Sequence, residues 1–197
     1  HIGHFLLTNL LMPAILAGAN PRIVNLSSAG HTHSDVNLDD PNFEKSEYNA
    51  WESYGRSKSA NIHFTQEIVR RYGDRIQSFA VHPGVIMTEL GRHLTPELMN
   101  EMTERVKSRA TSSTEAKETG VLPFKSVEAG AATQVWASVT EDLSENNGAY
   151  LGDCQVGVEG GNPSESGYLP YIFNKETAEA LWSLSEKLVK QEFPQLT

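Results

Sequence analysis

The sequence has one cysteine, few basic residues and no long apolar run, and each shortage excludes a class of protein. Cys154 stands alone, so no internal disulfide can form, and a reducing, cytoplasmic setting is expected. Lysine and arginine number 16 against 25 acidic residues, so the formal net charge is -9, which argues against nucleic acid or an anionic membrane as a partner. The apolar stretch "FLLTNLLMPAILAGA" contains polar residues and a proline and is shorter than the about 20 residues of a transmembrane helix.

Two further absences concern the start of the chain and its serines. The chain begins at His1 without a methionine or a signal-like segment, so we expect a piece of a longer protein. The pattern Gly-x-Ser-x-Gly does not surround Ser27 or Ser28, which argues against a nucleophilic hydrolase. With 39% hydrophobic residues, the 197 residues should form a single partial domain.

Helical and strand patterns alternate along the chain. This alternation predicts an α/β fold with a parallel sheet and crossover helices. Only three strands are visible, so the first has an unpaired edge, and its side chains Ile23, Val24 and Leu26 should be partly exposed. In the terminal helix, Ala178, Leu181, Trp182, Leu188 and Val189 should point inward. Helices are expected at 1–16, 50–71, 126–139 and 175–190, with Ser126 as a cap, and strands at "RIVNLSS", "QSFAVHPG" and "GAYLGDCQV".

Residues 88–123 differ from the rest in being polar and moderately helical, and they end in a run rich in Ser, Thr and Glu. Such a segment is more typical of a lid than of a core element. Its apolar residues lie at helix-compatible spacings and could line a lipophilic substrate site: Leu90, Leu94, Leu98, Met99 and Met102.

Polar groups with catalytic chemistry lie at strand ends. Tyr54 and Lys58 are four residues apart, hence on one helical face, although this spacing alone is a weak signal. Ser27 and Ser28 end one strand, and a Pro-Gly turn ends the next. Because strand ends and adjacent helix faces converge in a parallel sheet, these segments should meet at one ligand crevice.

The segments "IVNLSS", "YGRSKSAN" and "VHPGVIMT", in this order, resemble the catalytic half of a short-chain dehydrogenase/reductase. The later segments "FKSVEAGAATQVWAS" and "NGAYLGDCQV" are similar to the retinol-dehydrogenase and WW-domain-oxidoreductase branch of that family. The resemblance covers essentially all 197 residues. It implies a Rossmann-type doubly wound parallel sheet, here a C-terminal portion without the N-terminal strands.

The resemblance implies hydride transfer between NAD or NADP and a lipophilic alcohol or carbonyl compound. Tyr54 would be the general acid/base; a phenol ordinarily has a pKa of about 10, so it needs the nearby charge of Lys58, which would also hold the nicotinamide ribose. Ser28 would orient the substrate oxygen, and it is preferred to Ser27 because it lies three residues after Asn25. Besides Tyr54 and Lys58, the residues that match the family's cofactor loop are Pro83, Gly84, Val85 and Thr88.

The resemblance also shows what this sequence does not contain. The family's phosphate-binding Gly-rich turn, its NAD-or-NADP selector and its Asn-Ala-Gly segment lie upstream of the first helix, and the asparagine of its proton relay would precede His1. We therefore expect the 197 residues alone to bind nicotinamide cofactors weakly or not at all. Because the upstream strands are also missing, we expect them to be aggregation-prone or partly unfolded. The sequence does not decide whether a membrane anchor lies upstream of His1.

Two alternatives remain beside this enzyme interpretation. The first is a truncated, inactive remnant that acts at most as an interaction or dimerisation module. Either interpretation is compatible with a homo-oligomer. The second is a metal site at His31 and His33, but no third ligand has matching spacing, so no metal is expected.

Overall fold

The computed structural model describes residues 1–110, 124–141 and 143–196. The fold is α/β, and the strands of its central sheet lie in the order β1, β2, β3, β4. The first three strands are parallel, and the short fourth strand runs antiparallel to the third. The strands span Arg22–Leu26 (β1), Gln77–His82 (β2), Tyr150–Gly152 (β3) and Gln155–Val156 (β4).

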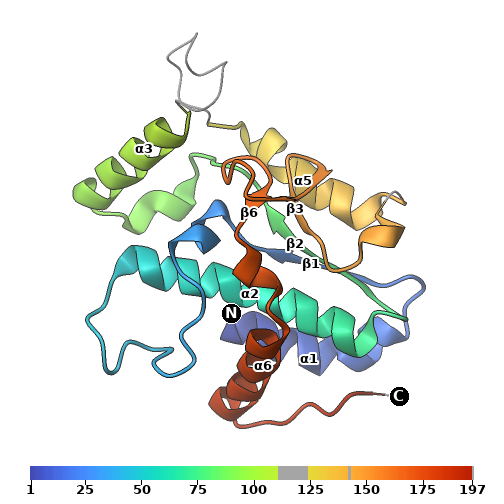
Figure 1. The fold of residues 1–197 in the computed structure, drawn as a ribbon. Coiled ribbons are helices and arrows are strands. Elements are labelled where there is room, and N and C mark those ends of the chain that lie inside the picture. The colour runs from blue at the N-terminus through green and yellow to red at the C-terminus, as the bar shows by residue number, and fades with distance from the viewer. Residues whose placement is uncertain (111–123, 142, 197) are drawn as a thin grey trace.

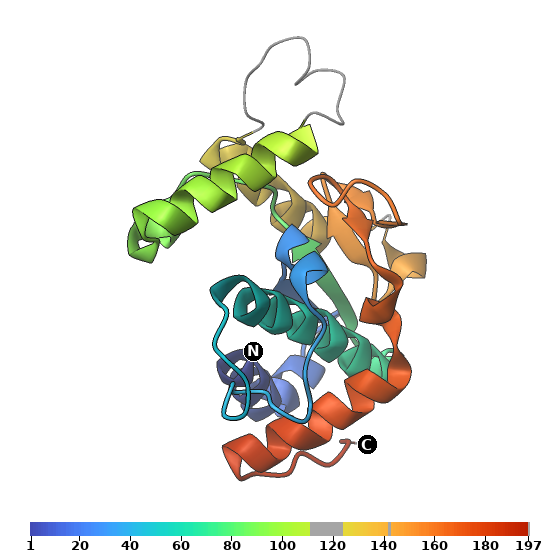
Figure 2. The same cartoon turned by 60° about the vertical axis from the view of Figure 1, so that its left-hand side comes forward.

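Helices cover both faces of this sheet, as expected for a doubly wound fold (Figure 1). Helices α1, α2 and α6 lie on one face, and α5 lies on the other (Figures 1 and 2). Helix α3 stands apart from these layers, on the side where the parallel strands end. The helices span Ile2–Leu16 (α1), Ala50–Tyr72 (α2), Pro96–Ala110 (α3), Val127–Val139 (α5) and Lys175–Val189 (α6).

Helix α2 spans 23 residues and has a clear start signal. The Asn49 side chain accepts a hydrogen bond from the backbone N–H of Glu52 at 2.9 Å, which satisfies one of the free donors of the first turn. One face of the helix buries Phe64 and Ile68 against Phe5 of α1 and Trp182 of α6. Each such side chain contributes roughly 1.5–3 kcal/mol when it leaves water, so this cluster anchors α2 beneath the sheet.

Strand β2 lies at the centre of the sheet and is buried on both faces. Phe79, Ala80 and Val81 have no exposed surface. Phe79 and Val81 pack with Ala137 of α5, whereas Ala80 belongs to a cluster on the opposite face. This continuous apolar run is the pattern expected of a parallel strand covered on both sides.

Two sequence expectations were wrong in detail. The segment "GAYLGDCQV" is not one strand, because Asp153 and Cys154 adopt left-handed φ values of 50° and 53° and turn the chain back, so β3 and β4 form a hairpin. In α6, Leu188 is 41% exposed instead of pointing inward. The helix starting after Ser126 is confirmed, with Ser126 Oγ accepting from the N–H of Ala129.

The remaining described elements are short. Helix α3 accounts for the helical part of segment 88–123, and residues 111–123 lie outside the described residues. Strands β5 (Val158–Glu159) and β6 (Gly167–Tyr168) form a separate parallel pair. Single-turn 3-10 helices span Ala29–His33, Glu89–His93, Ser144–Asn146 and Pro170–Phe173.

The outer edge of β1 borders a partly apolar surface. Ile23 and Val24 are half-buried and Leu26 is 47% exposed, which agrees with the expected loss of cover. On α1, Leu7, Leu10 and Leu11 are also exposed. None of the helices described by the structure combines the length and apolar character needed to cross a membrane.

Candidate active site

The two serines after β1 have different surroundings. Ser27 is buried, and its hydroxyl donates to the carbonyl oxygen of Lys58 at 2.9 Å, which joins the end of β1 to α2. Ser28 is half-buried, lines a cavity, and its Oγ accepts a hydrogen bond from the N–H of Gly30 at 3.0 Å. Of the two serines, Ser28 is the one that lines this cavity.

Tyr54 lines the same cavity from α2 and is 37% exposed. Its ring lies directly against the serine turn, because a Cβ built on Gly30 would be only 2.4 Å from Tyr54 Cε1. An atom at that distance could not be accommodated without a shift. Gly30 thus permits the close approach of the two segments that carry Ser28 and Tyr54.

Lys58 lies one helical turn after Tyr54, with its ammonium 5.4 Å from the centroid of the Tyr54 ring. The side chain is half-buried, and burial lowers the pKa of its ammonium group. Lys58 is not among the residues that line the cavity. The structure therefore places Ser28 and Tyr54 on the cavity wall and Lys58 beside the tyrosine ring.

The loop after β2 forms a further wall of the cavity. Gly84, Val85 and Thr88 line it, whereas Pro83 does not. Gly84 has a φ of +90°, and a Cβ there would also meet the Lys125 side chain at 2.6 Å. Both facts explain why glycine occupies this position.

Sequence reasoning missed the side chains that hold this loop. The backbone N–H of Lys125 donates to the carbonyl oxygen of Val85 at 2.9 Å, and the Lys125 ammonium pairs with the carboxylate of Asp153. His82, the last residue of β2, accepts hydrogen bonds from backbone N–H groups on both sides of the cavity. Its position directly before the Pro-Gly turn was the one available signal.

The cavity has a volume of about 360 Å³ and a largely apolar lining. This volume is at the lower end of the range of small-molecule sites, which combine apolar walls with a few convergent polar groups. Leu98, expected to line the site, is not part of the lining. The apolar side chains from the 88–123 segment that do line it are Leu90, Leu94, Met99, Met102 and Val106.

Helix α3 contacts the first turn of α2 through a polar and aromatic cluster. The indole N–H of Trp51 donates to Glu101 Oε2 at 2.5 Å, and the Arg105 guanidinium lies 5.2 Å from the centroid of the Trp51 ring. The His33 ring is 5.8 Å from the same indole, with its Nδ1 3.5 Å from Arg105 Nη1. These four side chains, here called the Trp51 cluster, join α3 to the first turn of α2, and two of them, His33 and Arg105, line the cavity.

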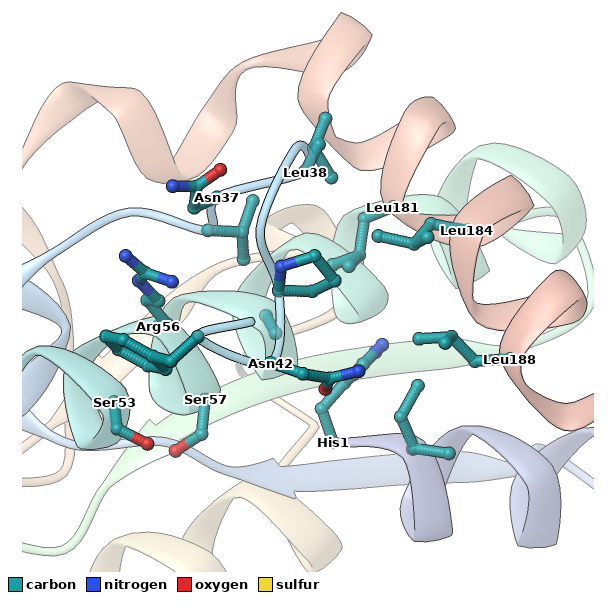
Figure 3. Close-up of a pocket in the computed structure, with 15 residues that line it drawn as sticks. His1, Asn37, Leu38, Asn42, Ser53, Arg56, Ser57, Leu181, Leu184 and Leu188 are labelled. Atoms are coloured by element: carbon teal, nitrogen blue, oxygen red, sulfur yellow. The ribbon is translucent and has the colours of Figure 1, made fainter. Parts of the chain in front are cut away.

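A second cavity, of about 320 Å³, lies between α2, α6 and the loop after the serine turn (Figure 3). Leu181, Leu184 and Leu188 line it from α6, opposite Ser53 and Ser57 of α2 (Figure 3). None of the residues expected in the site from the sequence lines this cavity. Nor do the described residues contain a group of three or more histidine, cysteine or acidic side chains that could hold a metal ion.

Comparison with known proteins places the chain in a family, although no family model matches it. The short-chain dehydrogenase/reductase prx1 of Penicillium roqueforti is 37% identical, over 96% of this chain and 54% of the relative. Human retinol dehydrogenases 14 and 13 are each 36% identical, over 96% and 98% of this chain and over 50% and 53% of the relatives.

One solved structure agrees in fold. A crystal structure of an uncharacterised protein from Mycobacterium paratuberculosis superimposes with a TM-score of 0.64 at 27% identity, covering 98% of this chain and 58% of that one. The chain spans about half the length of the curated relatives it matches. The chain belongs to the short-chain dehydrogenase/reductase family.

Proposed function

We propose that the protein containing these residues transfers a hydride between NAD or NADP and a lipophilic alcohol or carbonyl compound. The observation that carries this proposal is that Ser28 and Tyr54, from different strand and helix segments, line one apolar cavity at the ends of the parallel strands. The family supports an oxidoreductase, and the names of the human relatives specify retinol, a lipophilic alcohol.

Tyr54 is the general acid/base in this proposal. On reduction of a carbonyl compound, the Tyr54 hydroxyl gives its proton to the substrate oxygen, and on oxidation the phenolate takes the alcohol proton. The Lys58 ammonium lies close to the ring, where its positive charge would offset the negative charge that develops on the tyrosine oxygen during proton transfer. Ser28 Oγ donates a hydrogen bond to the substrate oxygen and so fixes its position between the two hydroxyls.

The residues around the cavity suit the nicotinamide end of a dinucleotide. The bound nicotinamide supplies or accepts the hydride. The ammonium of Lys58 is half-buried, and ribose hydroxyls would give it hydrogen-bond partners. Gly84 has a positive φ and no side chain, so a ligand in the cavity can approach its backbone. With Tyr54, the residues proposed to hold this end are Lys58, Pro83, Gly84, Val85 and Thr88.

A second candidate function is an interaction or dimerisation module without catalysis. The observation that favours it is the exposed apolar side of α1, where Leu7, Leu10 and Leu11 face solvent. Apolar patches of this kind mark contacts with other protein surfaces. In this case the serine and tyrosine would be relics of an active ancestor.

Cofactor titration separates the two functions. The full-length protein is titrated with NADH and NADPH by calorimetry. Reduction of medium-chain aldehydes is followed by the loss of the absorbance of the reduced nicotinamide. Micromolar binding of one cofactor together with turnover is the expected result. A stable dimer in light scattering without cofactor binding or turnover would instead support the interaction module.

We further propose that segment 88–123 is the substrate lid and that the Trp51 cluster holds its helix closed. Glu101→Ala should raise KM about threefold to tenfold with little change in kcat, because it removes the hydrogen bond to the indole but no group in the reaction. Hydrogen exchange of α3 amides should become faster. Glu104→Ala, on the same helix but paired with Lys107, is the matched control, and equal effects of the two variants would contradict the proposal.

A further inference from the structure

His82 lies where the two loops of the candidate site meet. It is the last residue of β2, its side chain is only 1% exposed, and it borders the cavity. Its Nδ1 atom accepts a hydrogen bond from the N–H of Ala29 at 3.2 Å and a longer one from the N–H of Gly84 at 3.4 Å. Ala29 follows Ser28, and Gly84 belongs to the loop proposed to cover the nicotinamide.

This geometry requires one form of the imidazole ring. Because Nδ1 accepts from both backbone groups, the neutral ring carries its proton on Nε2. Burial, together with the positive charge of Lys125, lowers the pKa of His82 to about 4. The other ionisable groups that face the ring are Asp153, which opposes this shift, and His31, which adds to it. The ring therefore stays neutral, and able to accept, at any pH near neutrality.

We propose that His82 is a positioning residue that sets the distance between the Ser28 turn and the Pro83–Gly84 loop. This inference rests on the proposed function, in which Ser28 holds the substrate oxygen and the loop holds the nicotinamide. Hydride transfer needs the reacting atoms about 3–3.5 Å apart, so a small change in the spacing of these two segments costs rate. One ring atom that binds both segments fixes that spacing.

The alternative is that His82 only fills space at the end of a buried strand. A leucine of similar volume would then serve equally well. An asparagine, by contrast, is smaller but places its Oδ1 close to the position of Nδ1, so it keeps the acceptor. The pair His82→Leu and His82→Asn therefore separates an acceptor role from a packing role.

The test uses the protein as its gene encodes it. In His82→Leu, hydrogen exchange at the amides of Ala29 and Gly84, followed by NMR without cofactor or substrate, should be at least about tenfold faster, and kcat should fall about tenfold or more. In His82→Asn, both values should return to within about threefold of the native protein. Equal behaviour of the two variants, whether both native-like or both impaired, would overturn the proposal.

Native protein provides a second measurement that needs no variant. Between pH 6.5 and about 4 the unfolded chain binds a proton at this histidine that the folded chain does not, so acidification lowers the stability of the fold across this window. Protection of the Ala29 and Gly84 amides, corrected for intrinsic exchange, should hold down to about pH 5 and fall together near pH 4 as Nδ1 is protonated. Protection unaffected by titration of the ring would overturn the proposal.

These readouts also separate the inference from the function on which it rests. Hydrogen exchange reports the link between the two loops whether or not the protein turns over a substrate. If the native protein is inactive with every cofactor but exchange is faster in His82→Leu, the oxidoreductase proposal is wrong and the link between the two loops still stands. If the native protein is active and exchange in His82→Leu is native-like, the link is wrong and the oxidoreductase proposal still stands.

Discussion

Replacing Tyr54 by phenylalanine is expected to lower turnover by about 100-fold or more and to leave the fold intact. The change removes one hydroxyl and keeps the ring that packs against Gly30. Since Tyr54 is 37% exposed and lines the cavity, loss of its hydroxyl should leave no buried group without its hydrogen-bond partner. The measurement is kcat in the reducing direction, together with the midpoint of thermal unfolding.

Tyr48→Phe is the matched control for this experiment. Tyr48 is 67% exposed and does not line the cavity, so the same loss of a hydroxyl there should leave kcat unchanged. If Tyr54→Phe turned over substrate like the native protein, the proton would reach the substrate by another route. The acid/base assignment would then be wrong.

Gly30→Ala should have the second largest effect, a loss of about tenfold to 100-fold in turnover with about 1–3 kcal/mol of destabilisation. The backbone of Gly30 does not adopt a positive φ, so alanine fits the local conformation. Its methyl group, however, would lie 2.4 Å and 2.6 Å from two carbon atoms of the Tyr54 ring. Either the ring or the serine turn must move, and both carry proposed catalytic hydroxyls.

Gly3→Ala provides the comparison for Gly30→Ala. A Cβ on Gly3 meets no atom within 4 Å, and the residue lies in helix α1, where alanine is favoured over glycine by up to about 1 kcal/mol. This variant should keep native turnover and melt at the same or a slightly higher temperature. Native turnover in Gly30→Ala as well would mean that the contact between the turn and the ring has no part in catalysis.

The secondary structure could largely be predicted because it depends on local patterns. A short apolar segment between turn residues predicted β1 and β2, a 3.6-residue period predicted α2, and an alanine-rich run after the cap Ser126 predicted α5. The hairpin of β3 and β4 could not be predicted, because only one of its two left-handed residues, Asp153, is a common turn former, whereas Cys154 gives no turn signal. Leu188 likewise fits the apolar period of α6 and is still 41% exposed, because it lines the second cavity instead of packing in the core.

The sequence by itself determined the family, the alternation of the main helices with β1, β2 and β3, and the choice of Ser28, Tyr54 and Lys58 as candidate catalytic residues, because the motifs that carry them are short and contiguous. Only the tertiary structure decided how these groups lie: Tyr54 against Gly30, and Lys58 outside the cavity lining. It also decided the contacts of His82 with Ala29 and of Trp51 with Glu101. Each of these contacts joins residues tens of positions apart, and their distance is set by how the helices pack on the sheet, which no local pattern encodes.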